Sequence, residues 1–176
     1  ILVNNAGIYR TGAVIDHVSQ DWDDTLKTNL YGPFYYCRAV LPAMVQKKWG
    51  RIVNISSISG RTGEIHGAAY SASKFGLIGL SQSLALEVAH QGITVNAVCP
   101  GWVDTDMSQR QLNDENWCKL NSIDQNESME IARLSSPQMR FIEPGEVGEL
   151  VTWLCSHAAR GITGQSLNIC GGMQPS

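Results

Sequence analysis

Short apolar runs of strand length alternate along this chain with longer stretches of helical periodicity. The runs expected to form strands lie at 1–4, 51–56, 93–98 and 166–169. The stretches expected to form long helices lie at about 19–48, 68–90 and 144–156. Strands that are joined through helices can pair in parallel, because a parallel connection needs a long crossover. The alternation therefore predicts an α/β fold on a parallel sheet, half of a doubly wound one, in a single domain over residues 1–176.

The ends of these elements carry their own signals. Ser19 is expected to cap the first long helix, which should bend near Pro42 and stop at Gly50. Pro144 fits the first turn of the last helix. The polar stretch 104–140 has an irregular pattern, and we expect it to form a mobile lid rather than part of the core.

Composition disfavours several classes of partner. With 43% hydrophobic and 16% charged residues, the 176-residue chain can bury one core. A formal net charge of −3 without a basic run disfavours a nucleic-acid or anionic-membrane surface. No apolar stretch reaches the roughly 18–20 residues that a bilayer crossing needs. We expect neither a nucleic-acid nor a membrane partner.

The cysteines and histidines are spread along the chain. Five cysteines, an odd number with wide spacings, predict reduced thiols in a cytoplasmic protein rather than a disulfide framework or a zinc site. They are Cys37, Cys99, Cys118, Cys155 and Cys170. The four histidines are equally scattered, so no metal site is expected.

Tyr70 and Lys74 form the strongest local signal for chemistry. They stand four residues apart in a predicted helix, so the phenol and the ammonium share one face. A phenol ionises near pH ~10, and a neighbouring ammonium is expected to lower that pKa toward useful acid–base work. The alternative is a surface helix that happens to carry one Tyr and one Lys.

Polar or small residues follow three of the predicted strands directly. Ser57 comes after the second strand, thirteen residues before Tyr70, while 4–7 and 100–101 follow two others. Ligands of an open parallel sheet bind beyond the carboxyl ends of its strands. This shared position predicts one site, although each segment alone could be an ordinary turn.

The motifs N-N-A-G, T-N-L, S-S-I-S-G, Y-S-A-S-K and C-P-G-W-V-D-T, taken together, resemble the classical short-chain dehydrogenase/reductase family. The resemblance covers nearly the whole chain and is weaker from about 107 to 137. It implies the C-terminal two-thirds of a doubly wound Rossmann-type sheet with helices on both faces. It also implies a catalytic tetrad, which would be Asn29, Ser57, Tyr70 and Lys74.

The resemblance gives each tetrad residue a role. Tyr70 would be the general acid in carbonyl reduction, and Ser57, with Ser56 as its rival, would bond the substrate oxygen. Lys74 would lower the pKa of Tyr70 and hold the ribose of the nicotinamide. Asn29 would anchor a water in a proton relay, unless its side chain only bonds its own helix backbone.

The same resemblance implies a dinucleotide site for NADP or NAD, with NADPH slightly favoured. Its cofactor-binding residues would be Asn4, Ala6, Gly7, Tyr70, Lys74, Pro100, Gly101, Val103 and Thr105. The C-terminal motifs are similar to β-ketoacyl reductases and to ketoreductases of aromatic polyketide pathways. A β-ketoacyl thioester or polyketide is therefore the expected substrate, with Trp102 and Trp117 as candidates either for shaping its pocket or for packing.

The chain departs from the family pattern at its start. The glycine-rich strand–turn–helix that binds the diphosphate in the family does not occur in this sequence. We expect an N-terminally truncated domain, which alone would bind the dinucleotide weakly and expose an apolar edge strand. The alternatives are a secondary or cyclic alcohol dehydrogenase of the same family and a catalytically silent fragment. The family resemblance also implies a homotetramer or homodimer.

Overall fold

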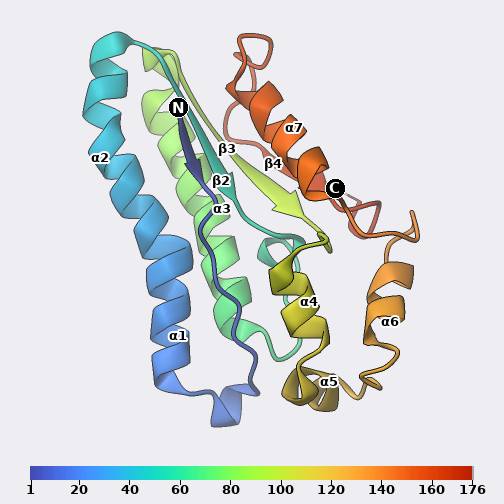
Figure 1. Cartoon of the computed structure of the whole chain (residues 1–176). Coiled ribbons are helices and arrows are strands. Elements are labelled where there is room, and N and C mark those ends of the chain that lie inside the picture. The colour runs from blue at the N-terminus through green and yellow to red at the C-terminus, as the bar shows by residue number, and fades with distance from the viewer. Residues whose placement is uncertain (176) are drawn as a thin grey trace.

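The structure, a computed structural model, describes residues 1–175 and contains a parallel four-stranded sheet in the order β1-β2-β3-β4 (Figure 1). The strands are β1 (Leu2–Asn4), β2 (Gly50–Ile55), β3 (Ile93–Pro100) and β4 (Ser166–Ile169). Helices pack on both faces of this sheet. The α/β fold predicted from the alternating pattern is confirmed.

Three long helices and several short ones connect the strands. The long helices are α2 (Gly32–Lys47), α3 (Ala68–Val88) and α7 (Pro144–Cys155). The shorter α-helices are α1 (Ser19–Leu26), α4 (Asp106–Leu112), α5 (Glu115–Asn121) and α6 (Ser128–Leu134). A π-helical segment η2 (Lys27–Tyr31) joins α1 to α2, and the 3₁₀ turns are η1 (Val14–Asp16), η3 (Ile58–Gly60) and η4 (Ala89–Gln91).

The sheet separates two hydrophobic cores. Successive residues of a strand point to opposite faces, so Ile52 packs under α2 and α3 while Val53 packs under α7. The strands follow one another in a single direction across the sheet. Because α7 packs on the other face of the sheet, the β3–α7–β4 crossover has the opposite hand to the β1–α2–β2 and β2–α3–β3 crossovers. Such a change of hand is rare, since about 98% of parallel crossovers are right-handed. As a result, helices reach the carboxyl ends of the strands from both faces.

The region predicted as one bent helix over 19–48 differs in detail. Val18, not Ser19, occupies the N-cap position, and the irregularity is the π-helical segment at Lys27–Tyr31, while Pro42 lies inside α2. Lys48 ends the helix in a left-handed conformation with φ 49°. Gly50 already belongs to β2, where an added Cβ would lie 2.6 Å from the Met44 sulfur. The expectation that Gly50 stops the helix was therefore wrong, because close packing against α2 is what requires glycine there.

The polar stretch after β3 forms a layer of three short helices, α4, α5 and α6, beyond the carboxyl ends of the strands (Figure 1). A separate apolar cluster around Leu112, Trp117 and Ala132 holds these helices together. An isolated bridge between Val103 and Ile142 joins the two ends of this stretch. We call residues 104–141 the lid layer.

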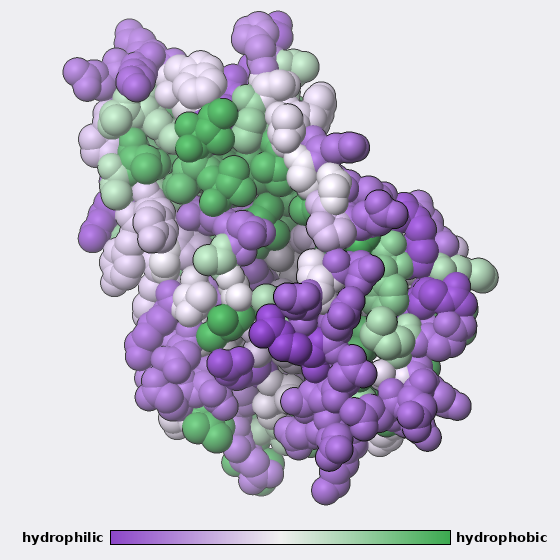
Figure 2. Space-filling model, viewed as in Figure 1, coloured by the Kyte–Doolittle hydropathy of each residue, from purple (hydrophilic) through white to green (hydrophobic). Residues whose placement is uncertain are grey.

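Two surface properties follow from this arrangement. Within residues 1–175, every helix is too short or too polar to span a bilayer. β1 lies at one edge of the sheet, with Ile1 65% and Val3 40% exposed. Figure 2 shows apolar surface gathered on this side of the molecule, between α2 and α7.

Candidate active site

Two adjoining cavities lie at the carboxyl ends of the strands and share Ser57, Tyr70 and Gly101. The first, of about 620 Å³, runs along the strand ends between α3 and α7, and we call it the strand-edge cavity. The second, of about 380 Å³, opens toward the lid layer, and we call it the lid pocket. Tyr70 and Ser57 thus stand where the two spaces meet.

Tyr70 and Lys74 share one face of α3, as their spacing predicts. The Nζ atom of Lys74 lies 5.4 Å from the centroid of the Tyr70 ring. The same Nζ donates a 2.8 Å hydrogen bond to the carbonyl oxygen of Ile55, the last residue of β2. Lys74 is only 4% exposed and lines the strand-edge cavity, so its ammonium is fixed between the sheet and the helix.

Burial dominates the ionisation of both groups. Burial raises the pKa of Tyr70 to about 12, the neighbouring Ser57 hydroxyl opposes this, and the charge of Glu64 adds to it. Burial lowers the pKa of Lys74 to about 8, with Cys99 acting in the opposite direction. The Tyr70 shift is opposite to the lowering that the helix spacing predicts, because loss of hydration outweighs the neighbouring ammonium. Tyr70 is therefore held as a neutral phenol that can donate a proton.

The structure distinguishes the two candidate serines. Ser57 follows β2 and lines both cavities together with Tyr70, and its hydroxyl accepts a 3.1 Å hydrogen bond from the Ser59 N–H. Ser56 also lines the strand-edge cavity, but its hydroxyl donates a 3.0 Å hydrogen bond to the carbonyl oxygen of Lys74. Ser57 is thus the serine beside the phenol, while Ser56 ties β2 to α3.

Asn29 lies fully buried in the π-helical segment, a type of distortion often found at functional sites. Its Oδ1 accepts from the backbone N–H of Ile8 at 2.8 Å, and its Nδ2 donates to the Ile8 carbonyl at 2.9 Å and to Ser73 Oγ at 3.1 Å. These bonds hold the loop after β1 rather than the backbone of its own helix. Asn29 therefore positions Gly7, the residue before Ile8, against Lys74.

Of the three cofactor-binding residues predicted in and beside the loop after β1, only Gly7 lines the strand-edge cavity. A Cβ added there would lie 3.6 Å from Lys74 Nζ. Asn4 instead turns into the core, where its Nδ2 donates to Asn54 Oδ1 at 2.7 Å, and Ala6 is exposed outside the cavity lining. Asn5, which was not among the predicted cofactor residues, lines the cavity. The two-residue period of extended backbone explains why Asn4 and Asn5 face opposite ways.

The end of β3 and the segment after it contribute four of the predicted residues, and all of them line the strand-edge cavity: Pro100, Gly101, Val103 and Thr105. A Cβ on Gly101 would lie 3.0 Å from Cys170 Cα, so close backbone approach requires glycine there. Thr105 is the N-cap of α4 and accepts a hydrogen bond from the Ser108 backbone. The cavity wall is therefore fixed to the start of the lid layer.

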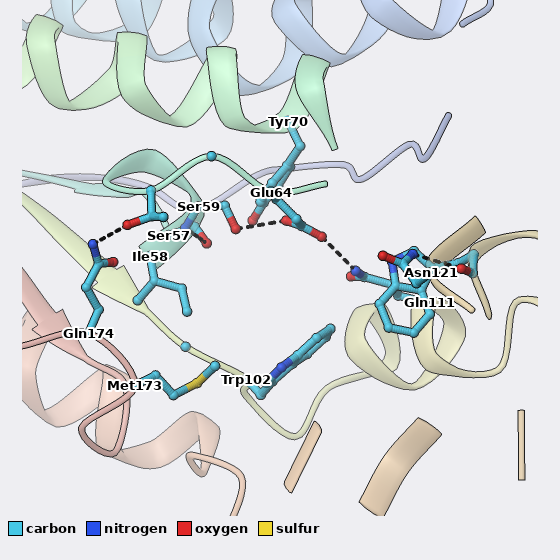
Figure 3. A pocket seen from close by; sticks show the side chains of 14 residues that line it. Ser57, Ile58, Ser59, Glu64, Tyr70, Trp102, Gln111, Asn121, Met173 and Gln174 are labelled. Atoms are coloured by element: carbon cyan, nitrogen blue, oxygen red, sulfur yellow. Dashed lines mark hydrogen bonds between the residues drawn. The ribbon is translucent and has the colours of Figure 1, made fainter. Parts of the chain in front are cut away.

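A polar cluster around Glu64 was not anticipated from the sequence. Glu64 lies in the loop between Ser57 and Tyr70, and it lines the lid pocket on the same side as both (Figure 3). Its carboxylate accepts from Tyr9 at 2.7 Å, from Ser59 at 2.9 Å and from Gln111 of α4 at 3.3 Å. The only signal in the sequence is one acidic residue between two candidate catalytic residues.

Trp102 and Trp117, predicted either to shape a substrate pocket or to pack, both line the lid pocket. Their rings meet edge to face with centroids 6.2 Å apart. Trp102 and Met173 lie across the pocket from Glu64 (Figure 3). Within residues 1–175, no group of three or more His, Cys, Asp or Glu side chains could hold a metal ion.

Comparisons with known proteins point to reductases. A family model described as enoyl-(acyl carrier protein) reductase matches residues 1–174. A Streptomyces coelicolor protein named as a ketoacyl reductase is 42% identical over 175 residues. The D-beta-hydroxybutyrate dehydrogenase of Cupriavidus necator is 39% identical over 172 residues. In both comparisons, 98% of this chain is covered but only 66% of the relative, which is just under two-thirds of its length.

A solved structure agrees closely with this fold. The crystal structure of an actinorhodin polyketide ketoreductase variant with NADPH superimposes with a TM-score of 0.91 at 41% sequence identity. The match covers 98% of this chain and 66% of that one. The described sheet and its helices thus have counterparts within a longer chain.

Proposed function

The chain belongs to the short-chain dehydrogenase/reductase family, and from that premise we propose that the protein is an NAD(P)-dependent oxidoreductase that reduces a carbonyl. The observation that carries the proposal is the position of Tyr70, Ser57 and Lys74 at the meeting of two cavities. One cavity has the place of a cofactor site at the strand ends, and the other opens to the lid layer.

Each of the three side chains has a role that its surroundings support. Tyr70, kept protonated by burial, donates its proton to the substrate oxygen as the carbonyl is reduced. Ser57, beside the phenol, donates a hydrogen bond to the same oxygen and stabilises the negative charge that develops there. In the reverse reaction the two groups act on the alcohol, with Tyr70 accepting its proton.

The residues of the strand-edge cavity fit a dinucleotide. The Lys74 ammonium carries three N–H donors and uses one of them on Ile55, which leaves donors for ribose hydroxyls. Gly7 and Gly101 bring bare backbone to the same cavity, together with Asn5, Val103 and Thr105. When bound, the nicotinamide supplies the hydride. NADPH is the favoured form in this proposal, since the actinorhodin ketoreductase structure contains it.

We propose a β-ketoacyl thioester or a related polyketide as the substrate. Relatives support this class: the ketoacyl reductase named above, and the 3-oxoacyl-(acyl-carrier-protein) reductase of Aquifex aeolicus, which is 43% identical over 173 residues. A second candidate is a dehydrogenase of secondary alcohols, which the similarity to D-beta-hydroxybutyrate dehydrogenase favours.

A substrate panel tests the proposal. The intact protein is supplied with NADPH or NADH and with acetoacetyl thioester models, cyclic ketones and simple secondary alcohols, and nicotinamide absorbance is followed. We expect the thioesters to be reduced with the highest kcat/KM. Turnover of only the alcohols or cyclic ketones would support the second candidate, and no turnover of any substrate would support a catalytically silent chain.

Three further expectations from the sequence remain proposals. Residues 1–176 would form part of one Rossmann-type domain, which would assemble as a homodimer or homotetramer. Exposed small residues on α3, including Ala72, Gly79 and Ser83, would allow helices of neighbouring subunits to approach closely. A cytoplasmic location would suit the five cysteines, which are all free thiols in the structure.

A further inference from the structure

Glu64 presents a carboxylate to the lid pocket from the side that holds Tyr70 (Figure 3). Three neutral donors from three separate segments fix its position: Tyr9 after β1, Ser59 in η3 and Gln111 in α4. A side chain bonded to three segments keeps one orientation in the pocket. The carboxylate is therefore a built feature of the pocket wall rather than a mobile surface group.

The hydrogen bonds of this carboxylate leave room for one more donor. An ionised carboxylate offers about four lone-pair sites. Oε1 accepts from Tyr9 and Gln111, and Oε2 accepts from Ser59. One acceptor site on Oε2 thus stays open for a ligand.

Among residues 1–175, no Lys, Arg or His side chain lies at salt-bridge distance from the Glu64 carboxylate. The ion pairs found among residues 1–175 involve other carboxylates, and Glu64 is the only charged side chain that lines the lid pocket. Lys74 lies in the strand-edge cavity, on the other side of Tyr70. Arg10 and Arg110 line a neighbouring cavity behind Tyr9 and Gln111, and Arg10 is paired with Asp21 at 3.5 Å. The lid pocket therefore has a negative wall.

The opposite wall is apolar. Trp102 and Met173 lie across from Glu64, and Ile58 lies beside them (Figure 3). A ligand carboxylate in this pocket would face a like charge with no cation to offset it, which disfavours binding. An uncharged ligand could pack its apolar side against Trp102 and Met173 and donate a hydrogen bond from one hydroxyl group to Glu64.

We infer that Glu64 determines substrate specificity: it excludes carbonyl substrates that carry a free carboxylate and favours uncharged substrates that bear a hydroxyl group near the carbonyl. This inference rests on the proposed reductase function and assigns the substrate class of that site. It separates the protein from a dehydrogenase of free hydroxy acids, since such an enzyme must accept a carboxylate.

Three matched ligands test the inference on the intact protein: ethyl acetoacetate, its 4-hydroxy derivative and the free acetoacetate anion. We expect kcat/KM to fall in the order hydroxy ester, ester, anion. Glu64→Gln should narrow the gap between ester and anion by about tenfold or more, because the repulsion acts at short range in a partly dehydrated pocket. Glu87→Gln, an exposed change of the same kind on α3, should leave all three values unchanged.

Two further measurements separate charge from shape. Tyr9→Phe removes one donor but keeps the carboxylate, so exclusion of the anion should persist. In the unchanged protein, raising the salt concentration from low to about 1 M should narrow the ester–anion gap, because salt screens the repulsion. This second measurement applies even if Glu64→Gln fails to fold.

The outcomes distinguish this inference from the proposed function. An ester–anion gap that neither Glu64→Gln nor salt narrows overturns the role of Glu64 while the reductase assignment stands. If none of the three compounds is reduced, the reductase assignment fails. The role of Glu64 is then tested by ligand-observed NMR titration, which compares the binding affinities of the same three compounds. Equal affinity for ester and anion, or no binding of any of the three, would then overturn it.

Discussion

Lys74 Nζ lies 5.4 Å from the centroid of the Tyr70 ring while it donates a 2.8 Å hydrogen bond to the last carbonyl of β2. One ammonium therefore joins the proposed proton donor to the sheet. Burial shifts the pKa values of the two groups in opposite directions, raising that of Tyr70 and lowering that of Lys74. Both shifts favour the uncharged forms, so a charged ligand group beside them will change their ionisation strongly.

Removing the phenolic hydroxyl tests the proton donor. Tyr70→Phe should reduce carbonyl turnover by about 10²–10⁴-fold, the usual contribution of a general acid, while dinucleotide affinity stays within a few-fold. Steady-state kinetics and a dinucleotide titration of the intact protein measure the two effects. Turnover within a factor of a few of the unchanged protein would refute the role of Tyr70.

Alanine substitutions of the two neighbouring serines should have different effects on kcat and on stability. Ser57→Ala should lower kcat strongly, because Ser57 lines both cavities beside the phenol, and it also removes the hydrogen bond that the Ser57 hydroxyl accepts from the Ser59 N–H. Ser56→Ala should mainly lower the free energy of unfolding by about 1 kcal/mol, since it removes the hydrogen bond to Lys74. Steady-state kinetics and urea unfolding of both variants measure these two effects. A larger loss of kcat in Ser56→Ala than in Ser57→Ala would assign the substrate contact to Ser56.

Lys74 should make stability depend on pH. Its folded pKa of about 8 lies below the unfolded 10.5, so the unfolded state binds more protons between these values and stability rises with pH there. The difference between a pKa of 10.5 and one of about 8 corresponds to about 3 kcal/mol, so below pH 8 Lys74→Met should stabilise the fold by up to about that amount, less the cost of the lost hydrogen bond to Ile55. This advantage shrinks toward pH 10.5. Denaturant unfolding of both proteins at pH 7 and pH 9.5 measures this difference. A difference that does not change with pH would contradict the buried ammonium.

Gly60 should tolerate no side chain. A Cβ at this position would lie 2.8 Å from the backbone carbonyl of Lys74, so Gly60→Ala must push α3 away from the strand ends. We expect it to destabilise the fold by about 1–3 kcal/mol and to lower turnover as well. Gly63→Ala is the matched control, since nothing lies within 4 Å of a Cβ there. Equal unfolding midpoints for the two variants would show that the contact is relieved at no cost.

The elements themselves could be predicted from the sequence, because periodicity and turn residues determine them locally. The strand at Ser166–Ile169 was predicted at its observed bounds, and α7 was placed within a residue or two. The π-helical segment at Lys27–Tyr31 and the opposite hand of the α7 crossover were not predicted. Both depend on which face of the sheet each segment packs against, and that is decided by contacts distant in sequence.

The candidate site shows the same division. Tyr70 and Lys74 were predicted to share a face because helix geometry requires it. The cluster of Glu64 with Tyr9 and Gln111 joins residues 55 and 47 positions apart, and no local pattern announces it. The direction of the Tyr70 pKa shift also depends on burial, which the sequence motif alone does not reveal.

The lid layer begins and ends at one point of the fold. Asp104 N–H donates to the carbonyl of Ile142 at 2.9 Å, and Ile142 N–H donates to the carbonyl of Trp102 at 2.8 Å. The two ends of the lid layer are therefore held side by side by the Val103–Ile142 bridge, and all four strands lie outside this stretch. A change of length or sequence within this stretch can therefore reshape the lid pocket, which Gln111, Trp117 and Asn121 help to line, without moving the ends of the strands.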